Sequence, residues 1–142
     1  ELISQILEVV KPEFKDKNIQ LKLKIEEDLF VKVCSSEMGQ VLLNLLNNAI
    51  QALNNLESGR REILIEASRQ NSKALISISD NGHGVSEDCQ SQLFELLTTT
   101  KQTGMGLGLW LCKHIVTRYC GSIHYEDAFG GGAKFVIELP LN

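Results

Sequence analysis

The chain has few cysteines, no long apolar run and no excess of positive charge, and each absence excludes a class of protein. Its cysteines form no Cys-x-x-Cys pair, which argues against a redox pair or a four-cysteine zinc site and favours a reducing cytoplasm. No apolar run approaches the roughly 18 residues of a membrane span, and residues 1–14 lack the apolar core of a signal peptide. A net charge of −4 offers no basic face for nucleic acid.

What remains is the composition of one globular domain. The length of 142 residues suits a single domain, and 43% hydrophobic and 23% charged residues are near globular averages. Apolar residues at helical spacing predict three main helices and a short one, over 2–10, 38–53, 107–119 and 89–94. Ser35 and Ser36 are predicted N-caps of the second helix, and Pro12 stands near the end of the first.

Alternating apolar residues predict the strands, over 20–25, 62–67, 73–79, 122–126 and 134–139, with a short extended piece at 29–33. The second and third strands flank a polar turn and predict an antiparallel hairpin. Its core-facing residues are predicted to be Ile63, Ile65, Leu75, and Ile76 or Ile78. Helices and strands come in runs, so we expect an α+β fold, a two-layer sandwich rather than a βαβ repeat.

Three asparagines interrupt the leucine-rich helix predicted over 38–53. Asn44 and Asn48 are four residues apart and therefore lie on one helical face. Asparagine is unfavourable in mid-helix because its amide competes with the backbone, so these residues need an explanation. One explanation is an oxygen ligand for Mg²⁺, which prefers hard oxygen donors, and the other is a solvated helix face.

Residues 80–84, Asp-Asn-Gly-His-Gly, follow a predicted strand directly. The Asp80 carboxylate at a strand end can accept a hydrogen bond from an exocyclic amine, and Gly82 and Gly84 allow the backbone to approach a flat ring. An Asn-Gly turn with a solvated histidine is the simpler alternative.

A glycine-rich segment opens the last predicted helix, with Gly104, Gly106 and Gly108 in alternate positions. Backbone amides at a helix N-terminus form an anion site suited to a triphosphate. The residues just before it supply hydroxyls and one cation within reach of phosphate oxygens: Thr99, Thr100 and Lys101. The segment is neither a Walker A motif nor a dinucleotide fingerprint, and a glycine-rich loop without a ligand is the alternative.

In this order and spacing, the motifs resemble the catalytic ATP-binding domain of sensor histidine kinases, in the superfamily that includes gyrase, heat-shock chaperone and mismatch-repair ATPases. Residues 40–49 resemble its N box, 80–84 its G1 box, 93–95 its F box and 104–108 its G2 box, and 130–140 is similar to its closing strand. The likeness implies a Bergerat fold, a mixed sheet covered on one face by three helices, with a flexible ATP lid over 98–104. Residues 1–18 resemble a segment that leads out of dimerisation helices, and 19–142 the catalytic domain itself.

The resemblance also implies a role for each motif residue. Asp80 would hold the adenine amine, Asn48 would coordinate Mg²⁺, the three glycines would meet the phosphates, and residues 99–101 would belong to the lid. The ATP-binding set that it implies is Asn44, Asn48, Asp80, Gly82, Gly84, Val85, Thr99, Thr100, Lys101, Gly104, Met105, Gly106, Leu107 and Gly108. The chain departs from the family pattern at Leu96 and Leu97 after the F box, at Ala133 in place of a threonine, and at Gln51 in place of a lysine.

One further departure bears on the reaction. The family's ATPases carry a glutamate where this chain has Asn44, and a neutral amide is no general base, so we expect slow hydrolysis. Phosphoryl transfer to an imidazole needs little base. None of His83, His114 and His124 has the helical setting before an acidic residue that the resemblance implies for an acceptor, so we expect the acceptor on a separate domain. The alternatives are a conformational-switch ATPase of the gyrase or chaperone type and a degenerate binding module.

The resemblance implies ATP and Mg²⁺ as cofactors. It implies two partners, a phosphoacceptor helical domain of the same protein and a downstream response regulator, and neither nucleic acid nor direct membrane contact. We expect the isolated domain to be a monomer, its parent to be a homodimer, and this portion of the parent to be cytoplasmic.

Overall fold

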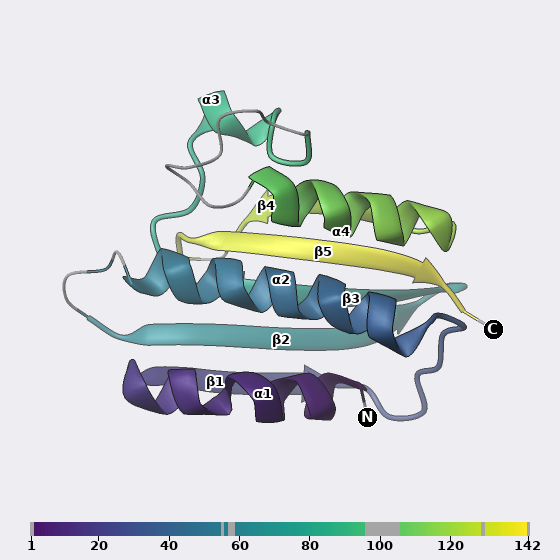
Figure 1. Ribbon diagram of the computed structural model, residues 1–142, viewed down its shortest axis with the longest axis horizontal. Helices are drawn as coiled ribbons and strands as arrows, with labels where there is room; N and C mark the ends of the chain where they lie inside the picture. The colour runs from purple at the N-terminus through teal and green to yellow at the C-terminus, as the bar shows by residue number, and fades with distance from the viewer. Residues whose placement is uncertain (1, 55, 57–58, 96–105, 129, 142) are drawn as a thin grey trace.

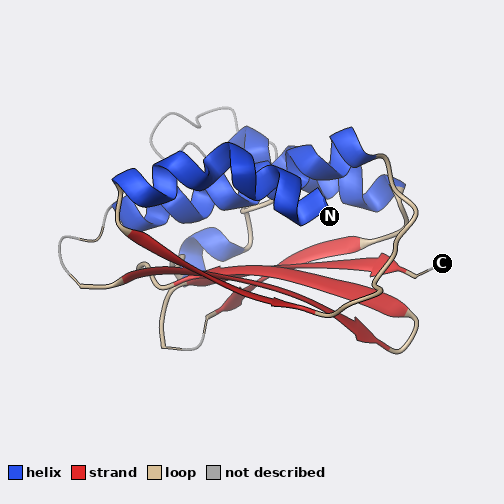
Figure 2. Ribbon diagram, turned by 90° about the horizontal axis from the view of Figure 1, so that it is seen from below, coloured by secondary structure: helices blue, strands red, loops and turns tan. Residues whose placement is uncertain are grey.

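In the computed structural model, helices cover one face of a five-stranded sheet (Figure 2). The structure describes residues 2–54, 56, 59–95, 106–128 and 130–141. The helices are α1 (Leu2–Asp16), α2 (Ser35–Asn54), α3 (Glu87–Gln90) and α4 (Gly106–Arg118). The strands are β1 (Ile19–Ile25), β2 (Arg61–Gln70), β3 (Lys73–Asp80), β4 (Ser122–Asp127) and β5 (Ala133–Pro140). No helix in these ranges is both long and apolar enough to cross a membrane.

The strands lie in the order β1-β2-β3-β5-β4. β1 and β2 are parallel and are joined through α2, whereas all other neighbours are antiparallel. β2 and β3 form the predicted hairpin, in which Gln70 faces Lys73 and Asn71 adopts a positive φ of 59° in the turn. The sheet is therefore mixed, as predicted, and its last strand in the chain, β5, lies between β3 and β4.

Helix α2 lies in the middle of the helical layer, between α1 and α4 (Figure 1). Its apolar residues recur at helical spacing and are buried against the sheet and the neighbouring helices: Met38, Val41, Leu42, Leu45, Leu46, Ala49, Ile50 and Leu53. Each buried leucine or isoleucine contributes about 1.5–3 kcal/mol to folding. This packing fixes the rotation of α2, so Asn44 and Asn48 are half-buried beside the core.

The start of α2 differs from the prediction. Ser35 and Ser36 lie inside the first turn, and the preceding residue is Cys34, whose carbonyl accepts a hydrogen bond from the Met38 amide at 3.0 Å. The serines were predicted as caps from their type alone, but the cap is the residue whose carbonyl accepts the first helical hydrogen bond.

Helix α1 continues past Pro12 to Asp16, beyond the predicted end. Proline removes one helical hydrogen bond, and a helix usually ends before it. Here Phe14, two residues further on, is only 6% exposed and packs in the core. Tertiary packing therefore extends the helix through the proline.

Three other predictions need correction. Residues 29–33 form no strand, although Leu29, Val31 and Val33 pack against the core. Leu75 lies on the opposite face of β3 from Ile76 and Ile78, which are buried beneath the helices. The short helix α3 ends at Gln90 rather than continuing to residue 94, and turns follow it.

Candidate functional site

Asp80 ends β3 as a buried carboxylate, with 5% of its surface exposed. Its Oδ1 accepts hydrogen bonds from the backbone amides of Gly82, at 2.9 Å, and Ala133, at 3.4 Å. Burial raises the pKa of the carboxyl group, while these two hydrogen bonds act in the opposite direction. The amides fix the direction of the carboxylate, so it can act as an oriented acceptor for a donor arriving from solvent.

The loop after Asp80 is held close to α2. A Cβ at Gly82 would lie 3.0 Å from the Asp80 Oδ1 and 3.2 Å from the Ala52 carbonyl oxygen. Asn81 anchors the loop to the start of β2, because its Oδ1 accepts the Glu62 amide at 2.8 Å. A side chain at position 82 would therefore be tight against both the carboxylate and α2, which favours glycine there.

Gly132 lies against the other side of Asp80, in the segment 130–140 that resembles the family's closing strand. Its φ is 97°, and a Cβ there would fall well inside contact distance of the Asp80 carbonyl oxygen. Ala133, the next residue, donates the second hydrogen bond to the carboxylate. The run of three glycines was a signal for this close approach, but it did not identify the strand that is approached.

One row of residues on α2 connects two of the sequence motifs. Asn44, Asn48 and Ala52 are spaced by four and therefore line one side of the helix. Ala52 lies beside Gly82 in the Asp80 loop, and the Asn44 Cγ would be 3.9 Å from a Cβ at Gly108 in α4. Asn48 stands between these contacts, and its side-chain nitrogen is buried with no hydrogen-bond partner among the described residues. The fold therefore places an amide with an unpaired nitrogen between the carboxylate and the start of α4.

Asn44 and Cys112 lie where α2 and α4 meet. Gln40 Nε2, on α2, donates to Asn44 Oδ1 at 3.0 Å. The Cys112 thiol, on α4, donates to the Val41 carbonyl oxygen of α2 at 3.7 Å. Burial raises the pKa of this thiol to about 11, and the Asn44 side chain acts in the opposite direction. Cys112 is buried, whereas the other three cysteines, Cys34, Cys89 and Cys120, are exposed.

Asn48 fits the Mg²⁺ ion that the resemblance implies. Its amide offers one hard oxygen, which is the donor type that Mg²⁺ prefers when phosphates supply most of the other ligands. The amide nitrogen has no hydrogen bond in the described part of the chain. Rotating the side-chain amide so that its oxygen faces the ion would therefore break no hydrogen bond of that nitrogen. Asn44 fits less well, because Gln40 already donates to its oxygen.

Helix α4 begins at Gly106, and Gly108 lies in its first turn. The first amides of a helix have no acceptor inside it, and together with the helix dipole they attract anions. Of the predicted phosphate-binding and lid residues, five lie outside the described residues: Thr99, Thr100, Lys101, Gly104 and Met105. The described part of this motif therefore consists of the helix start beside Asn44.

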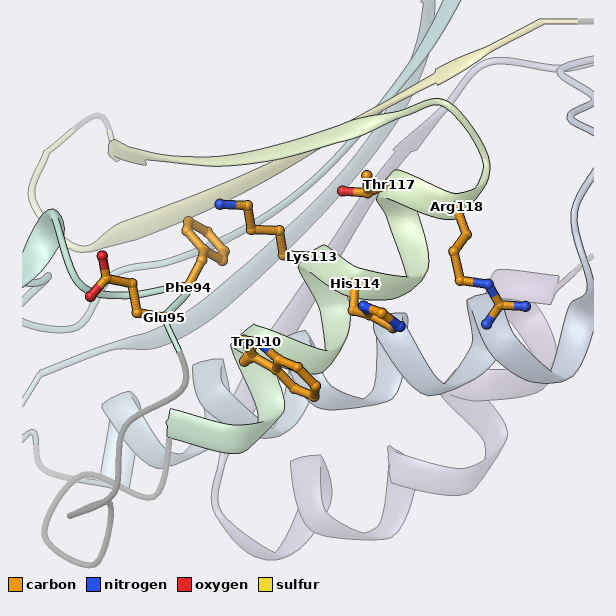
Figure 3. A pocket seen from close by; sticks show the side chains of 7 residues that line it. All are labelled: Phe94, Glu95, Trp110, Lys113, His114, Thr117 and Arg118. Carbon is orange, nitrogen blue, oxygen red and sulfur yellow. The ribbon is translucent and has the colours of Figure 1, made fainter.

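A separate groove lies on the outer side of α4 (Figure 3). Its lining residues come from α4 and from the segment after α3: Phe94, Glu95, Trp110, Lys113, His114, Thr117 and Arg118. The rings of Trp110 and His114 are stacked, with centroids 5.4 Å apart and an interplanar angle of 13°. No sequence motif predicted this surface, and the one signal for it was a tryptophan outside the apolar stripe of a helix.

Comparison with known proteins identifies the family. Residues 35–142 match the model described as "Histidine kinase-, DNA gyrase B-, and HSP90-like ATPase". "Sporulation kinase D" of Bacillus subtilis (strain 168) is 33% identical over 144 residues, which cover 100% of this chain and 28% of that protein. A nucleotide-free catalytic domain of histidine kinase ThkA matches with a TM-score of 0.87 and 29% identity, over 99% of this chain and 92% of that one. Histidine kinase ThkA in complex with the response regulator TrrA matches with a TM-score of 0.84 and 26% identity, over 99% and 40%.

The chain therefore belongs to the histidine kinase-, DNA gyrase B- and HSP90-like ATPase family. Within it, the chain is an ATP-binding catalytic domain of the histidine kinase type, and the predicted Bergerat fold is confirmed. It spans less than a third of the first curated relatives, at 28%, 22% and 30% of their lengths.

Proposed function

We propose that this domain binds ATP with Mg²⁺ and transfers the γ-phosphoryl group to a histidine on a separate phosphoacceptor domain of the same protein, in two-component signalling. The row on α2 carries this proposal, because it joins the Asp80 loop to the start of α4 with the Asn48 amide between them. One face of α2 therefore presents three groups in order: a hydrogen-bond acceptor for the nucleotide base, an oxygen ligand for a cation, and the anion site at the start of α4.

Each group has one task in this proposal. The Asp80 carboxylate accepts a hydrogen bond from the adenine amine, and the loop that contains Gly82, Gly84 and Val85 lies against the base. The start of α4 and the segment before it hold the phosphates, and the Asn48 oxygen is a protein ligand of Mg²⁺. When bound, Mg²⁺ neutralises charge on the phosphates during transfer.

The neutral Asn44 amide favours phosphoryl transfer to histidine over ATP hydrolysis. Hydrolysis requires a group that takes a proton from water, and the Asn44 oxygen instead accepts a hydrogen bond from Gln40. A neutral imidazole already has a free lone pair, so positioning and charge neutralisation suffice. The conformational-switch ATPase therefore remains the second candidate, and no described contact favours it.

The groove on α4 supports a helical partner for this reaction. An acceptor histidine must reach the γ-phosphate near the start of α4, and the groove lies along the outer face of the same helix (Figure 3). We infer that the phosphoacceptor helices dock against the rings that line the groove, Phe94 and the stacked pair of Trp110 and His114. The parent would be a homodimer in which residues 1–18 lead from the dimerisation helices, the isolated domain a monomer, and this part of the parent cytoplasmic.

A downstream response regulator is the second proposed partner. The support is that histidine kinase ThkA, to which this chain is similar, was solved in complex with the response regulator TrrA.

Calorimetric titration with a non-hydrolysable ATP analogue, with and without Mg²⁺, tests the site. We expect Mg²⁺ to strengthen binding by the wild-type chain, and Asn48→Ala to remove that enhancement while binding without Mg²⁺ persists. Asn54→Ala, at an exposed asparagine at the end of the same helix, is the control and should behave as wild type. Failure of the wild-type chain to bind in either condition would refute the proposal.

Radiolabelled ATP tests the reaction itself. The chain alone should not become labelled on histidine, whereas addition of the parent's phosphoacceptor helices should yield an acid-labile label on those helices. Labelling of His83, His114 or His124 in the isolated chain would contradict the assignment of the acceptor to a separate domain.

A further inference from the structure

Val85 is fixed at both of its backbone polar groups by side chains from two different elements. Its amide donates to the Tyr125 hydroxyl, on β4, at 3.0 Å. Its carbonyl oxygen accepts from Gln90 Nε2, on α3, at 2.8 Å. Val85 lies near the end of the loop that follows Asp80, just before Ser86, the N-cap of α3, so these two bonds hold the end of that loop in place.

The Tyr125 hydroxyl is itself oriented by its surroundings. Its single proton is donated to Asp127 Oδ1 at 2.9 Å, which leaves the oxygen lone pairs to accept the Val85 amide. The ring packs edge-on against Phe135, with centroids 5.5 Å apart and an interplanar angle of 67°. Burial raises the pKa of the hydroxyl, so it stays protonated at neutral pH.

The loop needs such anchors because it contains two glycines in three residues. Without anchors, Gly82 and Gly84 would let the backbone adopt many conformations. Binding would then select one of them, at a cost in conformational entropy. The Tyr125 oxygen also lies 3.4 Å from where a Cβ of Gly84 would stand, so the hydroxyl touches the loop at consecutive residues. A loop that is ordered before binding loses less entropy when a ligand arrives.

We propose that Tyr125 and Gln90 are positioning residues for nucleotide binding, which act by holding the loop from Gly82 to Val85 in the conformation that receives the base. This inference rests on the proposed function. Neither side chain belongs to the motifs that define the site, and each acts through the Val85 backbone rather than by touching the ligand.

The chain contains a matched control for Tyr125. Its other tyrosine, Tyr119, has the same bonding pattern: the hydroxyl accepts a backbone amide, that of Cys34, at 3.1 Å and donates to a carboxylate, that of Glu37, at 2.6 Å. Tyr119 follows the last residue of α4, at the opposite end of that helix from Gly106. Tyr119→Phe thus removes a hydroxyl with the same two hydrogen bonds, at a place remote from the Asp80 loop.

The test is a titration of the wild-type chain, Tyr125→Phe and Tyr119→Phe with ADP by calorimetry, together with thermal unfolding of each. Loss of a net hydrogen-bond contribution predicts about five- to tenfold weaker ADP binding by Tyr125→Phe. Tyr119→Phe should keep the wild-type affinity, while both variants lose thermal stability to a similar degree. The Val85 amide should exchange its hydrogen faster in Tyr125→Phe and at the wild-type rate in Tyr119→Phe.

Gln90→Ala supplies a second, independent variant. We expect weaker ADP binding in the same direction, and a combined loss in Tyr125→Phe/Gln90→Ala that differs from the product of the single losses, since both side chains hold one residue. Unchanged affinity in both single variants, or equal losses in the two tyrosine variants, would overturn the positioning role alone. A wild-type chain that binds no ADP would overturn the proposed function as well.

Discussion

We expect the buried carboxylate of Asp80 to affect protein stability and nucleotide binding in opposite directions. Burial raises the pKa of this group in the folded protein, so the folded state holds the proton more tightly than the unfolded chain. The stability that the group contributes is therefore complete below its unfolded pKa and is lost as pH rises through the folded value. Above its folded pKa the ionised carboxylate lowers the free energy of unfolding, and we propose that nucleotide binding accounts for its presence.

Asp80→Asn is expected to separate the two effects. Asparagine keeps an oxygen for the amides of Gly82 and Ala133 but carries no buried charge, so the variant should unfold at a higher temperature than wild type at pH 7. The difference should shrink as pH falls toward about 4, near the ordinary pKa of aspartate, while ADP affinity at pH 7 falls severely. Thermal unfolding across pH and calorimetry test this, with exposed Asp28→Asn as the control. A less stable variant at pH 7, or one with full ADP affinity, would contradict the assignment.

At the residue scale, the sequence predicted some members of the site and could not predict others. Asp80 and Asn48 belong to short local patterns that marked them as candidates, and the family resemblance supplied a role for each. Tyr125 is 40 residues from Val85, and no local pattern indicates that the two meet. The hydrogen bond from the Cys112 thiol to the Val41 carbonyl likewise depends on how α4 packs on α2.

The turn between β4 and β5 provides a test at the scale of elements. Gly131 and Gly132 have nearly equal φ values, 96° and 97°, but only Gly132 is pressed against another strand. Gly131→Ala should cost about 1–2 kcal/mol from its backbone conformation alone. Gly132→Ala adds a collision with the Asp80 backbone and should cost at least about 3 kcal/mol. Denaturant unfolding of the pair measures the difference, and equal losses would show that contact with β3 is unimportant.

The existence of most elements could be predicted from periodicity, but their ends and faces depended on packing. Helix α1 passes Pro12 because Phe14 is buried, a fact that no local propensity contains. Leu75 was predicted to face the core because it stands next to Ile76 and close to Ile78 in β3. The pairing of Ile78 with Ile65 shows which face of β3 lies beneath the helices, and Leu75 is on the other face. In both cases contacts between distant segments overrode a local preference.

At the scale of the whole molecule, α1 is part of the folded unit, packed against α2 and β1. The neighbours Val9 and Val10 test this, because they are the same residue type on one helix with exposures of 64% and 2%. Val10→Ala should lower the free energy of unfolding by about 2–3 kcal/mol, and Val9→Ala by less than about 0.5 kcal/mol. Urea unfolding of both variants is the measurement. A small effect of Val10→Ala would mean that α1 is only loosely attached to the rest of the domain.

The arrangement of the elements came from the family resemblance rather than from periodicity. Alternation in 134–139 predicts a strand but does not say that β5 lies between β3 and β4. That position depends on pairing between strands more than fifty residues apart, such as Ile76 with Ile137. Four motifs in a fixed order carried the missing information, because a known family already relates that order to one topology.

The central position of β5 has a consequence for how the domain folds. Gly132 and Ala133 complete the surroundings of Asp80, yet they come after all the other described helices and strands in the sequence. Until β5 pairs, β3 has only one of its two partner strands, β2, and the Asp80 carboxylate has only one of its two amide donors. Closing so long a loop is also the slow part of forming such a sheet. We therefore expect the proposed nucleotide site to form late, once β5 has inserted between β3 and β4.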